Sequence, residues 1–231
     1  MKNLSGSEQS KKIAAEKACE LVKDGMVVGL GTGSTTAFAI KELGRRVREE
    51  GLKIRGVPTS YASEALAIEC GIPLTSLAES PVLDIDIDGA DQVDVSLNVI
   101  KGGGAAHTRE KIVAMSSKTF VVIVDDKKFS DVLNRGVPIE VIPYARELVI
   151  RHIEKLGGKC TLRSGSGKDG PVISDNGNMI MDCDFGVIQN PAALAEKLSQ
   201  IPGLVEHGIF TNAAIVYIGY EDRVDVRSRK Q

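Results

Sequence analysis

The sequence has no strong excess of charge of either sign. Its 29 basic and 31 acidic residues leave a formal net charge of −2. A nucleic-acid-binding protein usually needs a basic face, so we expect no nucleic-acid partner. A small anionic ligand is still compatible with this balance, because a helix N-terminus and one or two lysines suffice to bind a phosphate.

Closely spaced cysteines and long apolar runs are also lacking. The 4 cysteines include no C-x-x-C pair, which argues against a zinc site or a redox dithiol. No apolar run approaches the ~20 residues of a membrane helix, and the polar first residues lack the apolar core of a secretory signal. We therefore expect a cytoplasmic protein with reduced thiols and no membrane partner.

What is present is the composition of an ordinary globular protein, 42% hydrophobic and 26% charged over 231 residues. Up to residue 131, short apolar runs alternate with segments of helical periodicity. This alternation predicts an α/β fold with a parallel sheet and helices on both faces, in which ligands bind beyond the carboxyl ends of the strands. We expect strands at 26–30, 53–57, 72–74, 83–88 and 119–124, and helices at 10–24, 36–50, 61–69 and 108–117.

After residue 131 the pattern becomes a mixture of strands and helices. Asn176-Gly177 marks a hairpin turn, and Asn190 is a suitable N-cap for a helix at 191–200. A strand leading into a helix is expected at 138–150, and further strands at 159–163, 172–175, 179–183 and 209–219. We therefore expect a parallel-sheet domain of residues 1–133 and 208–231 and a smaller α+β lobe of residues 134–207.

A glycine-containing turn, Gly31-Thr32-Gly33-Ser34-Thr35-Thr36, lies between an expected strand and an expected helix. Its glycines permit a tight turn, and its hydroxyls and helix-start amides are donors for a phosphate. It is neither a Walker loop nor a complete G-x-G-x-x-G motif, since position 36 is Thr. A simple tight turn with a Ser/Thr cap is the alternative, but the placement favours anion binding.

Three aspartates, Asp84, Asp86 and Asp88, alternate along the next expected strand and so share one face. Asp88 ends that strand, and Asp91 lies just beyond it. Two carboxylates at a strand end suit either sugar hydroxyls or a divalent metal, whereas a purely structural role has one of them capping a turn and the others facing water. Because the 3 histidines are scattered, we favour a sugar.

Lys101 precedes three consecutive glycines, Gly102–Gly104, and Glu110 follows in the first turn of an expected helix. Consecutive glycine amides can form a nest for an oxyanion. A carboxylate beside such a nest supplies what an enolisation requires, namely a base and a group that holds the developing negative oxygen. A flexible linker and a capping carboxylate are the structural alternatives.

The strand at 119–124 leads into a charged cluster, Asp125-Asp126-Lys127-Lys128. A lysine at this place could reach the carboxyl edge of the sheet. A solvated cluster of charges explains the pattern equally well.

Together these motifs resemble those of type A ribose-5-phosphate isomerases. The match consists of GLGTGST at 29–35, DGAD at 88–91, KGGGAA at 101–106 with TREK at 108–111, and VDDKK at 124–128, in this order. The resemblance implies interconversion of D-ribose 5-phosphate and D-ribulose 5-phosphate in the pentose phosphate pathway, without a metal or an organic cofactor. It also implies a Rossmann-like main domain, a small ferredoxin-like lobe and a homodimer or homotetramer.

The resemblance also assigns roles to single residues. Glu110 would be the base that moves a proton between C2 and C1, Asp88 would assist ring opening, and Lys101 would hold the enediolate with the glycine amides. The segment 59–63 departs from the serine-richer version of the family pattern. The other substrate-binding residues implied are Thr32, Gly33, Ser34, Thr35, Gly89, Ala90, Asp91, Gly102, Gly103, Gly104, Lys128 and, from a Lys-Lys pair alone, Lys11.

Two other functions use similar motifs. A CoA transferase with a glutamate nucleophile would need room for a large thioester, for which the chain is too compact. A sugar-phosphate sensor would normally carry a DNA-binding helix-turn-helix, for which the segment before the first expected helix is too short, and it would tolerate losing Glu110. The set of Asp88, Lys101 and Glu110 therefore favours an enzyme.

Overall fold

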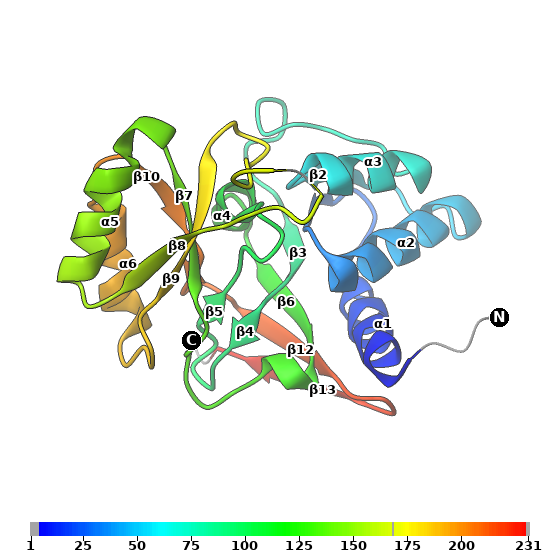
Figure 1. The fold of residues 1–231 in the computed structure, drawn as a ribbon. Coiled ribbons are helices and arrows are strands. Elements are labelled where there is room, and N and C mark those ends of the chain that lie inside the picture. The colour runs from blue at the N-terminus through cyan, green and yellow to red at the C-terminus, as the bar shows by residue number, and fades with distance from the viewer. Residues whose placement is uncertain (1–4, 168, 230–231) are drawn as a thin grey trace. The chain divides into compact units, whose positions relative to one another are not determined.

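The computed structural model describes residues 5–167 and 169–229, which fold into two compact units (Figure 1). The chain passes from the first unit to the second between Ala90 and Asp91, and back again between Thr108 and Arg109. The first unit runs to Ala90 and continues with Arg109–Phe129 and the chain from Asn212, while the second consists of Asp91–Thr108 and Ser130–Thr211. Two of the predicted motifs, DGAD and TREK, therefore contain a crossing point between the units.

The first unit is built on a sheet with the strand order β13-β12-β6-β3-β1-β2, in which only β13 is antiparallel to its neighbour. The chain moves outward from β1 to β2 and then returns past β1 to form β3. The strand order therefore reverses between β1 and β3, and this is where doubly wound sheets bind ligands. The strands are β1 Val27–Leu30, β2 Arg55–Pro58, β3 Ile85–Gly89, β6 Phe120–Asp125, β12 Ile215–Gly219 and β13 Val224–Ser228.

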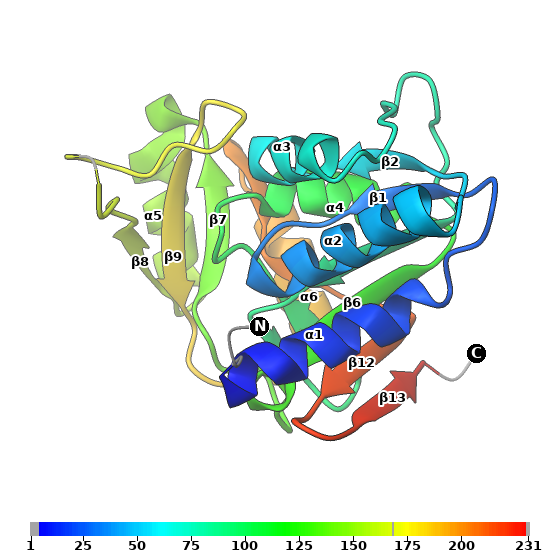
Figure 2. The same ribbon diagram turned by 90° about the vertical axis from the view of Figure 1, so that its right-hand side faces the viewer.

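Helices cover both faces of this sheet (Figure 2). Side chains alternate along a strand, so Val28 packs with the helices α1, α2 and α3, whereas Val27 packs with Val113 of α4 on the opposite face. The helices are α1 Gly6–Cys19, α2 Ser34–Glu49, α3 Tyr61–Glu69 and α4 His107–Met115, and a short 3-10 helix, η1 Asp126–Lys128, follows β6. The predicted parallel sheet with helices on both faces is confirmed.

The second unit contains an antiparallel sheet with the order β10-β7-β9-β8. Its elements follow one another as β7 Val137–Val141, α5 Arg146–Lys155, β8 Lys159–Leu162, β9 Met179–Asp184, α6 Pro191–Ser199 and β10 Leu204–His207. This βαββαβ sequence is the ferredoxin-like arrangement, so the prediction of a ferredoxin-like α+β lobe is confirmed. A smaller sheet, β11-β5-β4, is formed by β4 Gln92–Val93, β5 Val99–Ile100 and β11 Ile209–Phe210.

Several local predictions need correction. The strand expected at 209–219 is two strands, because β11 pairs with β5 in the second unit and β12 pairs with β6 in the first. The strands expected at 72–74 and 172–175 form only isolated bridges, at Leu74 and Ile173. By contrast, Asn190 caps α6 by accepting a hydrogen bond from the Ala193 amide at 3.0 Å, as predicted.

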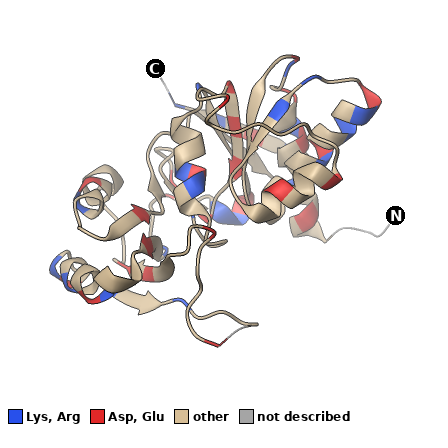
Figure 3. Cartoon of the chain, turned by 90° about the horizontal axis from the view of Figure 1, so that it is seen from above, with Lys and Arg blue, Asp and Glu red and all other residues tan. Residues whose placement is uncertain are grey.

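Acidic and basic residues occur on the same elements (Figure 3). On α2, for example, Arg45 contacts Glu42 at 2.7 Å and Glu50 at 2.7 Å. Exposed pairs of this kind contribute little to stability but keep the surface polar. Among residues 5–167 and 169–229, no helix is both long and apolar enough to cross a bilayer.

The expectation that all four thiols are reduced is wrong for Cys160 and Cys183. These residues lie opposite each other on β8 and β9, with a Cα–Cα distance of 4.2 Å, and form a disulfide. The strand register brings them together, although 23 residues separate them in sequence. Cys19 and Cys70 are free and buried, and burial raises the pKa of the Cys19 thiol.

We predict that protein denatured without reductant takes up an alkyl group at Cys19 and Cys70 only, because the other two cysteines are joined. Burial should make labelling of the native protein slow, since the thiolate is the reactive form. Intact-mass measurement after iodoacetamide treatment counts the labels, with reduced and denatured protein as the control. Labelling of all four cysteines without reductant would contradict the disulfide.

Candidate active site

The turn after β1 and the end of β3 meet at the strand-order reversal. The backbone amide of Thr32 donates to Asp88 Oδ1 at 3.0 Å, and the Thr36 hydroxyl donates to the same oxygen at 3.3 Å. Asp88 is completely buried. The first two predicted motifs therefore lie in contact at the carboxyl edge of the sheet, where a ligand is expected.

Gly31 makes this contact sterically feasible. A Cβ atom at this position would lie 2.1 Å from Asp88 Cγ. No side chain fits at that distance, so the residue that follows β1 must be glycine for the turn to approach the carboxylate. The glycine expected to allow a tight turn is thus required for the approach to Asp88.

Helix α2 begins immediately after this turn without a side-chain cap. Its N-cap residue is Gly33, with φ +117°, whereas α1, α3 and α6 are capped by Ser5, Ser60 and Asn190. The first amides of a helix lack intrahelical acceptors, and together with the helix dipole they attract anions. The start of α2 is therefore suited to a phosphate.

Lys11 adds positive charge at the start of α2. Its Nζ lies 3.2 Å from the Ser34 hydroxyl. A cavity of about 300 Å³ lies beside this pair, lined by Glu8, Lys11, Ser34, Ala37, Phe38 and Lys41. Lys128 lies at the end of η1, directly after β6, and is half-buried.

A group of hydroxyls beside Thr32 was not predicted as part of the site. Thr32 Oγ1 lies 2.8 Å from Thr59 Oγ1 and donates to Ser60 Oγ at 2.7 Å. Thr59 and Ser60 are buried, and Ser60 also caps α3. Both residues directly follow β2 at the same sheet edge, and that position is the sequence signal that could have identified them.

In the second unit, the pairing of β4 with β5 brings Asp91 beside Lys101. The Asp91 amide donates to the Ile100 carbonyl at 2.8 Å, and the Asp91 carboxylate accepts from the Gly103 amide at 2.7 Å. Lys101 is only 2% exposed, and its Nζ lies 5.7 Å from the centre of the Phe210 ring. Lysine is rarely buried to this extent, which points to a functional role.

The glycine loop after Lys101 is held in place and is no flexible linker. Gly102 has a φ of +109°, and a Cβ on it would lie 2.7 Å from His107 Nδ1. Arg163 donates to the carbonyls of Gly102 and Gly103 at 2.8 and 3.2 Å. Asp91 thus holds an amide of the loop, while Arg163 holds its carbonyls.

Glu110 lies in the first turn of α4 and is 3% exposed. The helix dipole favours a negative charge at this position. The neighbouring Arg109 guanidinium stacks on the Tyr61 ring, 4.7 Å from its centre. Glu110 is therefore a buried carboxylate at the N-terminal end of a helix.

Another buried carboxylate, Glu140 of β7, was not predicted as part of the site. It accepts hydrogen bonds from Thr108 at 2.5 Å, Ser174 at 2.8 Å and Asn178 at 2.7 Å, and also from Asn176. Burial raises the pKa of Glu140, but these hydrogen bonds outweigh burial and the net pKa is lowered. Its donors are distant in sequence, so no local pattern indicated the cluster.

The predicted site residues thus form two groups. Lys11, Thr32–Thr35, Asp88–Ala90, Glu110 and Lys128 belong to the first unit, and Asp91, Lys101 and Gly102–Gly104 belong to the second. No set of three or more His, Cys, Asp or Glu residues suited to a metal occurs among residues 5–167 and 169–229.

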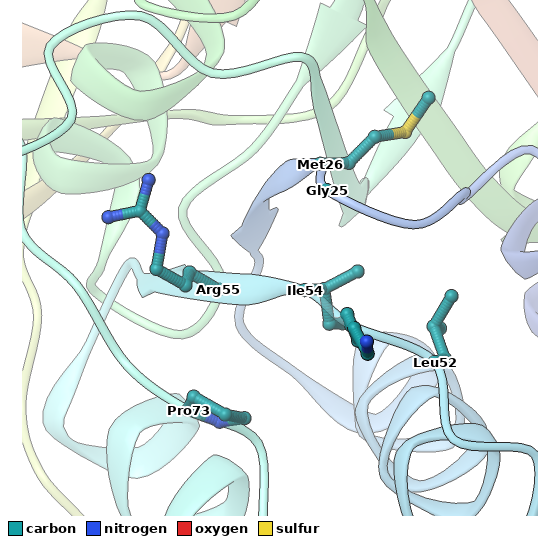
Figure 4. A pocket seen from close by; sticks show the side chains of 7 residues that line it. Gly25, Met26, Leu52, Ile54, Arg55 and Pro73 are labelled. Carbon is teal, nitrogen blue, oxygen red and sulfur yellow. The ribbon is translucent and has the colours of Figure 1, made fainter.

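Another pocket, of about 410 Å³, lies at the amino ends of β1 and β2 (Figure 4). Lys53 and Arg55 contribute its charged side chains, and no carboxylate lines it. It therefore lacks the carboxylate base that the sequence predicts for an enolisation. The remaining lining residues are Gly25, Met26, Leu52, Ile54 and Pro73.

Several known proteins are similar to this chain over most of its length. A family model for ribose 5-phosphate isomerase A (phosphoriboisomerase A) matches residues 55–223. The ribose-5-phosphate isomerase A of Methanosarcina acetivorans is 60% identical over 221 residues, which cover 96% of this chain and 94% of that protein. The corresponding protein of Methanothermobacter thermautotrophicus is 56% identical over 209 residues, covering 90% and 92%.

Solved structures agree with these sequence matches. Ribose 5-phosphate isomerase A from Methanocaldococcus jannaschii has a TM-score of 0.93 at 46% identity, covering 96% of this chain and 99% of that one. A D-ribose-5-phosphate isomerase in complex with phospho-erythronic acid has a TM-score of 0.94 at 47% identity, covering 97% and 100%.

We predict that Glu140→Gln lowers the free energy of unfolding by about 1–3 kcal/mol at pH 7, because the amide cannot accept from all the donors. The pKa of Glu140 is lower in the folded protein than the ordinary 4.5. Its stabilisation is therefore complete above that pH and is lost as the pH falls below it. Urea unfolding should show a smaller difference in the free energy of unfolding between Glu140→Gln and the wild type at pH 4 than at pH 7.

The matched control is Glu147→Gln on α5, whose carboxylate is 70% exposed beside Arg146. This variant should unfold like the wild type at both pH values. An equal loss of unfolding free energy in Glu140→Gln at pH 7 and pH 4 would contradict the stabilising role of the ionised carboxylate.

Proposed function

Since the chain belongs to the ribose 5-phosphate isomerase A family, we propose that it interconverts D-ribose 5-phosphate and D-ribulose 5-phosphate through an enediolate. The main support is the buried Glu110, at the start of the helix that follows the braced loop of Lys101 and Gly102–Gly104. The phospho-erythronic acid bound to a relative, a phosphorylated sugar acid, is consistent with a sugar phosphate substrate.

Glu110 is the base of the proposed reaction. It removes the proton from C2 of the open-chain aldose and returns it to C1, while a second proton moves from O2 to O1. Its location in the first turn of α4 supports this role, because the dipole stabilises the ionised form that must accept a proton.

Lys101 and the amides of the glycine loop hold the enediolate oxygens. Donors that are already oriented need no rearrangement as charge develops, and each contributes on the order of a few kcal/mol to the transition state. The hydrogen bond from the Gly103 amide to Asp91 fixes the orientation of the loop beside Lys101. Because it engages that amide, the amides of Gly102 and Gly104 are the ones assigned to the enediolate. Asp91 also contacts the substrate in this proposal.

Asp88 assists ring opening by exchanging a proton with a sugar hydroxyl. Its contact with the Thr32 amide supports a position beside the phosphate-binding turn. The turn of Thr32, Gly33, Ser34 and Thr35 binds the phosphate, with Lys11 and Lys128 as cationic partners and with Gly89 and Ala90 lining the sugar. An anchored phosphate restricts the reacting carbons, which lowers the entropic part of the barrier.

The proposal extends to the setting of the enzyme. We propose a cytoplasmic homodimer or homotetramer whose partner is a small sugar phosphate, with no nucleic-acid or membrane partner. The mixed surface charge supports the absence of a nucleic-acid partner.

Replacement of the base is the direct test. Glu110→Gln keeps the shape of the side chain but cannot accept the C2 proton, so kcat should fall at least ~100-fold. A coupled assay of ribulose 5-phosphate formation measures the change, with Glu154→Gln, an exposed residue of α5, as the control. Near-normal turnover of Glu110→Gln would remove Glu110 from the mechanism.

Chelation tests the metal-free reaction. The proposed steps use only side chains and backbone amides, so dialysis against EDTA should leave kcat and KM unchanged. The same assay, run before and after chelation, provides the measurement. Activity that disappears with EDTA and returns with a divalent cation would contradict the proposal.

A further inference from the structure

Arg163 follows β8 and contacts the glycine loop without belonging to any predicted motif. Its Nη1 donates to Gly102 O at 2.8 Å and to Gly103 O at 3.2 Å. The guanidinium is held in turn by Asp182 of β9, with Nε donating to Oδ2 at 2.8 Å and Nη2 donating to Oδ1. The pair thus connects the β8–β9 edge of the antiparallel sheet to the loop.

We propose that Arg163, held by Asp182, is a positioning residue that sets the direction of the loop amides for the isomerisation. This inference rests on the proposed function, because it matters for catalysis only if these amides hold the enediolate. Arg163 would act through the loop and would not touch the substrate.

The planar peptide group links the direction of each carbonyl to that of the amide that follows it. In a trans peptide the C=O and N–H bonds point to opposite sides, and no described bond in this chain is cis. Fixing the carbonyl of Gly102 therefore fixes the direction of the Gly103 amide, and fixing the carbonyl of Gly103 does the same for Gly104. Arg163 holds both carbonyls from one side.

Asp91 holds the nitrogen end of the peptide group between Gly102 and Gly103. Its carboxylate accepts from the Gly103 amide at 2.7 Å. The peptide group between Gly102 and Gly103 is thus held at both ends, by a cation on its oxygen and an anion on its nitrogen. Charge-assisted hydrogen bonds of this kind are stronger than neutral ones, so this peptide group should resist rotation.

The composition of the loop explains why such a brace is needed. Glycine has more backbone freedom than other residues, and three occur in succession before Ala105, which itself has a φ of +61°. An unbraced loop would sample several orientations of its amides. Preorganised donors are effective because they need no reorientation during the reaction, so the brace converts a flexible segment into a fixed one.

The guanidinium shape matters as much as its charge. The side chain of Arg163 is 17% exposed and uses separate nitrogens for Asp182 and for the loop carbonyls. A lysine would provide a single point charge and could not maintain this fork. Arg163→Lys should therefore behave more like Arg163→Ala than like the wild type.

The experiment compares Arg163→Ala, Arg163→Lys and Asp182→Asn with Arg146→Ala, which removes an exposed arginine of α5 that pairs with Glu147. We expect kcat to fall about 10- to 100-fold for both Arg163 variants, because small misplacements of catalytic groups have effects of this size. KM should change less than about threefold, because the proposal assigns phosphate binding to other residues. Arg146→Ala should match the wild type.

Amide hydrogen exchange of residues 101–106, measured by mass spectrometry, separates a positioning role from general destabilisation. A purely structural role would not change exchange in this segment alone. Arg163→Ala should accelerate exchange in this segment while β7 and β9 remain protected. Unchanged kcat or unchanged loop exchange in a folded Arg163→Ala protein would overturn the proposal. If that variant does not fold, Asp182→Asn decides by the same two measurements.

The proposed function and the positioning role of Arg163 can be contradicted separately. A wild-type protein without isomerase activity would overturn the proposed function, whereas loop exchange would still show whether Arg163 orders the loop. An active wild type that Glu110→Gln inactivates and Arg163→Ala does not would overturn the positioning role alone.

Discussion

The hydrogen bond from the Thr32 amide to Asp88 is the contact on which the arrangement of the predicted site residues in the first unit depends. It joins the turn after β1 to the end of β3, across the point where the strand order reverses. The contact requires a glycine at position 31, and it sets where α2 begins. The hydroxyls of Thr59 and Ser60 contact the side chain of the same Thr32, and the uncapped start of α2 follows directly after it.

In the second unit, three consecutive glycines give the loop after Lys101 a large backbone freedom. The structure restricts them with groups from elsewhere in the same unit, Asp91 on an amide and Arg163 on two carbonyls. Glu140 binds Thr108, two residues before Glu110 in the same helix α4. Order in the glycine loop and at the start of α4 is thus provided by buried or half-buried charged groups, of which Arg163 and Glu140 belong to no predicted motif.

The sequence could predict the features that are local. Gly31–Thr36, Asp88, Lys101–Gly104 and Glu110 each lie next to a strand end or a helix start, so periodicity and residue type were enough to identify them. The layer arrangement followed for the same reason, whereas the ferredoxin-like form of the second lobe was expected only from the family resemblance.

Features that depend on strand register could not be predicted in this way. Arg163 reaches Gly102 from 61 residues away, and Cys160 meets Cys183 only because β8 and β9 pair in one particular register. The split between β11 and β12 is partly of the same kind. The polar pair Thr211-Asn212 interrupts the apolar run at 209–219, but only the partner strands show that its two parts join different sheets. The antiparallel strand β13 lacked a clear apolar pattern, since its outer residues are exposed.

Proton transfer through an enediolate is tested most directly by the incorporation of deuterium from D₂O into carbon-bound positions of the sugar phosphate. NMR follows the rate of this incorporation over many turnovers. A proton carried by Glu110 can exchange with solvent, so the account predicts deuterium at C1 of the ketose, and it predicts that Glu110→Gln slows incorporation and turnover by the same factor. Product formed by the wild type with no carbon-bound deuterium would indicate a hydride shift and would contradict the enediolate.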